Sequence, residues 1–98
     1  MPLPDTMRQV VFTVPGGPEV LGLGTGPVPA PRDGEVLIEV AYAGVNRPDC
    51  LQRAGAYPPP PDASPILGLE VAGRVVALGA GVAAPALGAM VCALVPGG

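Results

Sequence analysis

The stretch GVNRPDCLQRAG, residues 44–55, gathers side chains capable of chemistry in a chain otherwise dominated by Val, Ala, Leu, Gly and Pro. It supplies amide, carboxylate, thiol and guanidinium groups, from Asn46, Arg47, Asp49, Cys50, Gln52 and Arg53. Amides donate and accept hydrogen bonds, and guanidinium groups bind carboxylates and phosphates. The stretch is therefore open to three interpretations: a reaction site, a metal site that has lost its ligands, or a capped helix.

The capped-helix interpretation needs no chemistry. Asn46 is a preferred N-cap residue, and Pro48 suits the first turn, where its missing N–H costs nothing. Asp49 favours the positive start of the helix and is placed to pair with Arg53, while Gly55 is expected to end the helix. These residues alone do not decide between a structural and a chemical role.

The composition excludes several classes of function. Glycine and proline number fifteen each, which favours short strands joined by turns over long helices. The net charge of −3 argues against nucleic acid as a partner, because phosphate binding needs a basic face. Histidine, the commonest general base, is absent. Cys50 and Cys92 lie too far apart for a CxxC pair, so we expect a reduced, cytoplasmic protein without a disulfide framework.

Five stretches are predicted as strands: residues 7–14, 19–26, 36–44, 69–79 and 89–95. The first is rich in β-branched residues, and the second is loosened by glycine. In the clearest one, strict alternation places Val36, Ile38, Val40 and Tyr42 on one face. Gly73 predicts a bulge or a bend of the kind that curls a sheet. Five short strands and one helical turn predict a single small domain that forms a curled β-barrel.

Three other stretches offer functional alternatives. GAGVAA, residues 79–84, fits a dinucleotide-binding pattern, but Pro85 prevents the helix that must follow, so we expect a turn. YPPPP, residues 57–61, is predicted to be a stiff loop that holds Tyr57 rather than a polyproline ligand. Residues 75–95 carry no charge and are long enough to span a bilayer, but Pro85 and the glycines favour strand, turn and strand.

The run from Gly44 to Val82, GVNRPDCLQRAGAYPPPPDASPILGLEVAGRVVALGAGV, resembles the catalytic-domain segment of the medium-chain dehydrogenase/reductase superfamily. It is most similar to the zinc-independent quinone oxidoreductases, and the resemblance extends from about Met7 to Gly98. It implies that residues 1–98 form part of a GroES-like barrel, mainly β with a short helix. The superfamily's Rossmann domain is absent, so the chain is expected to be an N-terminal portion of a longer enzyme.

The resemblance also implies which residues matter. In zinc-dependent members, a Cys and a His occupy the positions of Asn46 and Leu69, so no metal site is expected here. Asn46 and Tyr57 are the implied catalytic residues, and Asn46 and Arg47 are the implied contacts to NADPH. A quinone or an activated alkene is the implied substrate. Asp49 and Glu70 are expected to have ion-pair or scaffold roles, and the role of Arg53, in cofactor binding or ion pairing, stays open.

The resemblance leaves alternatives. An enoyl reductase of the same superfamily shares the same layout, and a non-catalytic interaction module is the alternative for a truncated chain. The complete protein is expected to be a homodimer, with neither nucleic acid nor membrane as a partner. Cys50 is expected to pack against the barrel rather than to act as a ligand.

Overall fold

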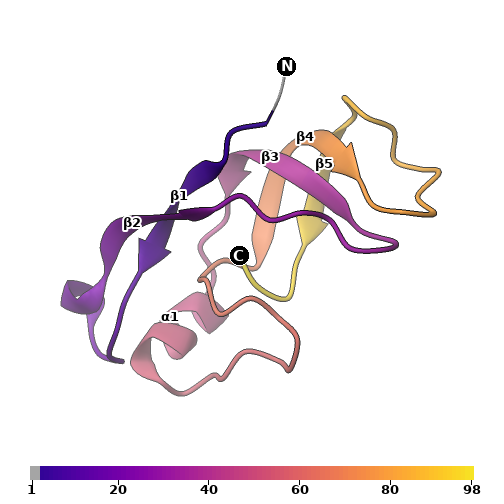
Figure 1. Cartoon of the computed structure of the whole chain (residues 1–98). Helices are drawn as coiled ribbons and strands as arrows, with labels where there is room; N and C mark the ends of the chain where they lie inside the picture. The colour runs from indigo at the N-terminus through magenta and orange to yellow at the C-terminus, as the bar shows by residue number, and fades with distance from the viewer. Residues whose placement is uncertain (1–2) are drawn as a thin grey trace.

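Residues 3–98 are described by a computed structural model, in which five strands and one α-helix follow one another (Figure 1). The two remaining residues of the predicted domain 1–98 lie outside the described part. The elements are β1 Thr6–Val11, the 3₁₀ turn Pro18–Val20, β2 Gly22–Pro27, β3 Val36–Ala43, α1 Arg47–Ala54, β4 Glu70–Leu78 and β5 Met90–Leu94. Each predicted strand and the predicted helix is confirmed. The first strand ends at Val11 and is shorter than predicted, and the second begins only at Gly22 because the 3₁₀ turn occupies the start of its predicted stretch.

The strands form two antiparallel sheets. β1 pairs with β2, from Thr6 opposite Pro27 to Val11 opposite Gly22. β4 is the central strand of the second sheet and pairs with β3 on one side and β5 on the other. No strand pairing joins the two sheets within residues 3–98, so the predicted barrel is partial and open.

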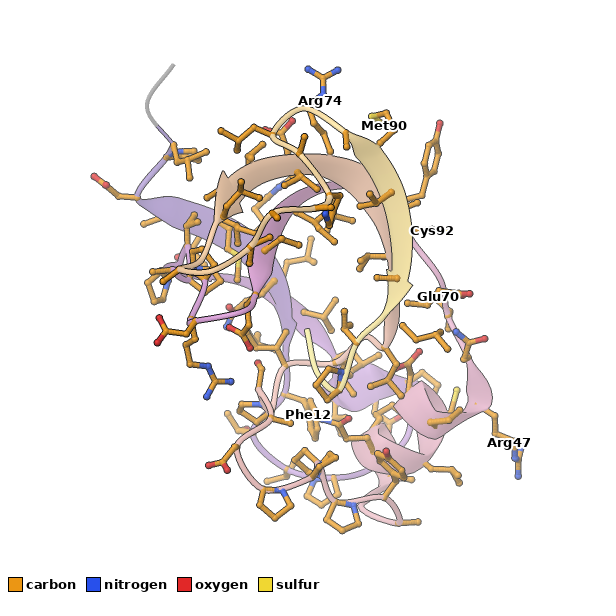
Figure 2. All side chains as sticks on the ribbon, turned by 90° about the vertical axis from the view of Figure 1, so that its right-hand side faces the viewer. Phe12, Arg47, Glu70, Arg74, Met90 and Cys92 are labelled. Carbon is orange, nitrogen blue, oxygen red and sulfur yellow. The ribbon has the colours of Figure 1, made fainter. Side chains whose placement is uncertain are left out.

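A β-bulge bends β3 against β4. Val40 lies opposite Gly73 and Tyr42 lies opposite Ala72, so Ala41 is an extra residue on β3. The bulge predicted from Gly73 is therefore present, with its extra residue on the neighbouring strand. Bulges of this kind bend a strand and increase its twist, which agrees with the arc of β4 and β5 in Figure 2.

The bulge also overturns the predicted alternation of β3. Val36 and Ile38 are half-buried as expected, but Tyr42 is 78% exposed. Because the extra residue shifts the alternation by one, Tyr42 lies on the same face as its partner Ala72, away from Ile38. The four residues predicted on one face are therefore divided between two.

The hydrophobic core is thin. Among residues 3–98, Val75 is the only hydrophobic residue classed as buried, with 1% of its surface exposed. Large apolar side chains such as Leu23, Val45 and Leu94 remain mostly exposed. An open pair of sheets covers only one side of each strand, so little apolar surface is removed from water.

The loop between β2 and β3 is fastened to the end of β4. The backbone N–H of Gly79 donates to the carbonyl of Glu35 at 2.7 Å, and that of Gly34 donates to the carbonyl of Ala80 at 2.9 Å. The Arg32 backbone N–H donates to the Glu35 carboxylate at 2.9 Å, and this bond lowers the pKa of Glu35 below its ordinary value. The loop is thus held by both backbone and side-chain contacts.

Residues 79–84 form a turn with Gly81 at φ 80°, and no helix follows, as expected for a sequence that only imitates a dinucleotide-binding motif. In the part of the chain that the structure describes, no helix is long and apolar enough to cross a membrane.

Candidate active site at the start of α1

The residues that were predicted to cap a helix lie at the two ends of α1. Asn46 is the N-cap residue, with extended backbone angles of φ −128° and ψ 166°. Its backbone N–H donates to Oδ2 of Asp49 at 2.9 Å, which is one half of a capping box. At the other end, Gly55 adopts the left-handed conformation with φ 87°. The capped-helix prediction is confirmed.

The side chain of Asn46 connects the helix to β4. Its Nδ2 donates to Oε1 of Glu70 at 3.1 Å, and the backbone N–H of Gly44 donates to the carbonyl of Glu70 at 2.9 Å. A Cβ at Gly44 would collide with the Glu70 carboxylate, so glycine permits this close approach. The bond to Glu70 uses one amide hydrogen of Asn46. The second amide hydrogen makes no other protein hydrogen bond within residues 3–98.

The predicted pairing of Asp49 with Arg53 is wrong. Arg53 donates from Nε to the carbonyl of Gly16 at 3.1 Å, and Gly16 donates its N–H to the carbonyl of Arg53 at 3.0 Å. Asp49 is 9% exposed and caps the helix with one oxygen, while its Oδ1 has no hydrogen-bond partner in the described residues. Asp49 and Arg53 therefore both make scaffold contacts, a role that was expected of Asp49 and left open for Arg53.

Gln52 is a structural residue that sequence reasoning missed. It is only 7% exposed, and its Nε2 donates to the carbonyl of Pro65 at 2.8 Å. This bond fastens the long loop after α1 to the helix. Burial of a glutamine is not visible in hydrophobic periodicity, and the only available signal was its place in the Q-R-x-G-x-Y run.

We expect replacement of Gln52 by leucine to lower the free energy of unfolding by about 1–3 kcal/mol. The leucine keeps the buried volume but leaves the Pro65 carbonyl without its donor. Gln9→Leu is the matched control, because Gln9 is half-buried and makes no side-chain hydrogen bond within residues 3–98. Urea denaturation measures both variants, and equal losses of stability would show that the bond to Pro65 contributes nothing.

No hydrogen bond or ion pair joins the other candidate residues to Asn46 within residues 3–98. Arg47 is exposed, extends away from the ribbon in Figure 2, and makes no hydrogen bond or ion pair among residues 3–98. Tyr57 is half-buried on the loop beyond α1, and no hydrogen bond joins it to Asn46 in the described part. Cys50 is exposed, so its predicted packing against the barrel is wrong. Asp49 and Gln52 occupy the buried face of α1, and Cys50 is turned away from it.

A pocket of about 230 Å³ lies beside α1. Its lining is mostly aliphatic and includes Val10, Leu21, Ala43, Gly44, Val45, Asp49, Cys50, Arg53, Leu67 and Gly68. An apolar pocket with a few polar groups is the usual setting for binding a small molecule. Gly44 and Val45 line the pocket and directly precede Asn46 in the chain, so the pocket adjoins the start of α1.

Residues 32–97 match the family model of the alcohol dehydrogenase GroES-like domain. The chain is 40% identical to an alcohol dehydrogenase of Schizosaccharomyces pombe, over 84% of this chain and 23% of that protein. It is 42% identical to the quinone oxidoreductase of Lama guanicoe, over 80% of this chain and 24% of that protein. The chain thus spans about a quarter of the length of these relatives.

The fold is likewise shared with a solved structure. The crystal structure of Escherichia coli quinone oxidoreductase complexed with NADPH matches 92% of this chain and 28% of its own, with a TM-score of 0.75 and 35% identity. The family model covers residues 32–97, and the solved structure aligns with 92% of the chain. The chain belongs to the alcohol dehydrogenase GroES-like domain family, within the medium-chain dehydrogenase/reductase superfamily of oxidoreductases.

Proposed function

We propose that this chain supplies the GroES-like portion of an NADPH-dependent oxidoreductase that reduces a quinone or an activated alkene without zinc. The observation that carries the proposal is the amide of Asn46, oriented by Glu70 at the start of α1 and beside an apolar pocket. The similarity to quinone oxidoreductases, one of them complexed with NADPH, supports it.

Arg47 and Asn46 are the proposed contacts to the cofactor. Arg53 is committed to the carbonyl of Gly16, whereas the guanidinium group of Arg47 is exposed and makes no protein contact within residues 3–98. A planar guanidinium fits the bidentate recognition of phosphate, which NADPH carries. When bound, NADPH supplies the hydride. A reducing, cytoplasmic setting suits a protein with two exposed free cysteines.

A zinc ion does not fit the donor set at this site. Zinc is held by thiolate, imidazole and carboxylate groups, and catalytic sites use three of them. The positions that the family resemblance gives to two ligands hold the amide of Asn46 and the alkyl side chain of Leu69. Glu70 offers a carboxylate, but it accepts a hydrogen bond from Asn46. No three side chains of the ligand types gather within residues 3–98.

Quinone reduction needs less electrophilic assistance than reduction of a simple ketone. Addition of a hydride and a proton converts a quinone to a hydroquinone, and the negative charge formed on the way is delocalised over the ring. A hydrogen-bond donor then suffices to stabilise the developing oxyanion. The second amide hydrogen of Asn46 is the proposed donor, and the hydroxyl of Tyr57 is a second donor or closes the pocket.

The first test is calorimetric titration of the 98-residue chain with NADPH. We expect no measurable binding, because the chain spans about a quarter of its relatives and offers only Arg47 and Asn46 to the cofactor. Binding with a micromolar dissociation constant would contradict this expectation, since it would require a far larger contact surface.

The second test compares substrates for a longer protein that carries this chain together with a nucleotide-binding domain. Turnover of a quinone with NADPH, well above turnover of an enoyl thioester, is the expected result. Faster reduction of the thioester would identify an enoyl reductase. Lack of turnover of either substrate, with NADPH bound, would overturn the proposed activity.

A further inference from the structure

Both polar ends of the Asn46 side chain face groups of this chain. Its Nδ2 donates to Oε1 of Glu70 at 3.1 Å, and its amide oxygen faces the backbone N–H of Asp49 in the capping box. Turning the amide over would set its oxygen against the Glu70 carboxylate and its NH₂ group against the Asp49 N–H. Two acceptors and two donors would then meet, so the surroundings favour a single orientation of the amide.

The backbone of two paired strands brings Glu70 to Asn46. Glu70 begins β4, and its carbonyl accepts the N–H of Gly44, the residue that follows β3, at 2.9 Å. Asn46 lies only two residues beyond Gly44. Figure 2 shows Glu70 at the end of β4 that lies toward the helix, opposite to Arg74. The place of the carboxylate is therefore set by the pairing of β3 with β4.

The Glu70 carboxylate has no competing partner in the part of the chain that the structure describes. It forms no ion pair there, and its only side-chain hydrogen bond is the one from Asn46. A Cβ on Gly44 would collide with Oε1 of Glu70 and would lie 2.9 Å from its Cδ. The carboxylate thus occupies the space that a side chain on Gly44 would take, and glycine at this position keeps it beside Asn46.

We propose that Glu70 is a positioning residue, which fixes the amide of Asn46 so that the site presents an N–H donor and not the amide oxygen. A hydrogen bond to a carboxylate is roughly twice as strong as one between neutral groups, which suits this task. The presented N–H fits a substrate oxygen that accepts a hydrogen bond, such as that of a carbonyl or a quinone. The choice of substrate rests on the proposed function, whereas the orientation of the amide is a property of the 98-residue chain.

The first test is a nitrogen–proton correlation NMR spectrum of the 98-residue chain, which needs no activity. Asn46 is the only asparagine, so its side-chain amide is readily identified. We expect one of its protons to lie downfield of both side-chain amide protons of Gln9, which makes no side-chain hydrogen bond within residues 3–98. Glu70→Gln is expected to move that proton upfield. An Asn46 amide in the original chain that resembles the Gln9 amide would overturn the proposal.

Gly44→Ala removes the contact without changing either partner. The added methyl group displaces the Glu70 carboxylate, which is the end of a flexible side chain, and Gly44 has no left-handed backbone angle. The fold is therefore expected to persist, with the same upfield movement of the Asn46 proton as in Glu70→Gln. A proton that keeps its downfield position in both variants would contradict the role of the carboxylate.

Glu39→Gln is the matched control for the loss of one negative charge. Glu39 is exposed on β3 and makes no side-chain hydrogen bond or ion pair in the described residues. It is expected to leave the Asn46 signals in place. An equal movement of these signals in Glu39→Gln would overturn the proposal, because it would trace the effect to net charge and not to the contact with Glu70.

The second test is kinetic and uses a longer protein that carries this chain together with a nucleotide-binding domain. Glu70→Gln is expected to lower kcat about tenfold with little change in KM, because the amide loses the orientation that serves the transition state. In an Asn46→Ser background the same change is expected to have no further effect, since the amide that Glu70 positions is gone. Losses that add in the double variant would show that Glu70 acts independently of Asn46, against the proposal.

The two tests separate this proposal from the proposed function. If the longer protein reduces neither a quinone nor an enoyl thioester, the proposed function fails, and the NMR spectrum still decides whether Glu70 fixes the amide of Asn46. If turnover is present but the Asn46 signals are the same in Glu70→Gln as in the original chain, the positioning role fails and the proposed function stands.

Discussion

Replacement of Gly73 by valine is expected to abolish the cooperative folding of this chain. A Cβ at Gly73 would collide with the carbonyl oxygen of Glu39 and would lie 3.1 Å from the backbone nitrogen of Ala41. Neither obstacle is a flexible side chain, so the strands β3 and β4 would have to separate at the bulge. Overpacking of this kind typically costs about 1–3 kcal/mol, and a backbone collision costs more.

The free energy of unfolding of this chain is expected to be too small to absorb such a loss. Val75 is the only hydrophobic residue classed as buried among residues 3–98, and β3–β4 is the pairing that covers it from one side. Even ordinary domains are stable by only about 5–15 kcal/mol. Circular dichroism during thermal unfolding is the measurement, and we expect no sigmoidal transition for the valine variant at any temperature.

Gly22→Val is the matched control for this experiment. A Cβ at Gly22 would lie 3.9 Å from the side chain of Val11, which is ordinary van der Waals contact, and Gly22 has no left-handed backbone angle. Valine also favours strands, so this variant is expected to fold at least as well as the original chain. Equal unfolding of both variants would mean that loss of glycine itself, rather than the collision at Gly73, is responsible.

The second large effect is expected at Asn46. In a longer protein with oxidoreductase activity, Asn46→Ser is expected to lower kcat about 100-fold, because serine lacks the amide donor proposed for the substrate oxygen. Serine remains a preferred N-cap residue, so the stability of α1 should change little. Steady-state kinetics with a quinone and NADPH gives kcat and KM separately, and thermal unfolding gives the stability.

Two further variants separate chemistry from structure. Ala54→Ser changes an exposed residue of the same helix that does not line the pocket, so its kcat should equal that of the original protein. Asn46→Ala removes the amide and the cap together, and is expected to lose about 1 kcal/mol of stability in addition to activity. Unchanged kcat in both Asn46 variants would exclude the proposed role of this side chain.

The elements of this fold are encoded by local signals, which is why sequence reasoning could predict them. β-branched residues are frequent in β1, β3 and β4, and glycine or proline interrupts the chain between strands. The helix is bounded by Asn46 and Gly55, whose preferences for cap positions follow from their own backbone and side-chain chemistry. The family resemblance rests on the region around this helix, and the match of the family model to residues 32–97 confirms it.

The contacts that sequence reasoning missed are those between distant segments. Asp49 and Arg53 are well spaced for an ion pair on an isolated helix, but Gly16 competes for Arg53 and the helix start competes for Asp49. The bond from Gln52 to Pro65 depends on the path of a loop that no local pattern describes. The extra residue Ala41 is equally invisible, because nothing in the alternation of β3 shows which side of the pairing takes the bulge.

The thin core determines how this chain responds to temperature. Unfolding raises the heat capacity in proportion to the apolar surface newly exposed to water, by about 12–15 cal/mol/K per residue in ordinary domains. Side chains such as Leu23, Val45 and Leu94 are already hydrated in the folded chain and add little to that change. The heat-capacity increment per residue is therefore smaller than usual, and the stability curve is correspondingly flat. Cooling weakens such a fold less than it weakens a densely packed one, because less of its stability comes from the hydrophobic effect.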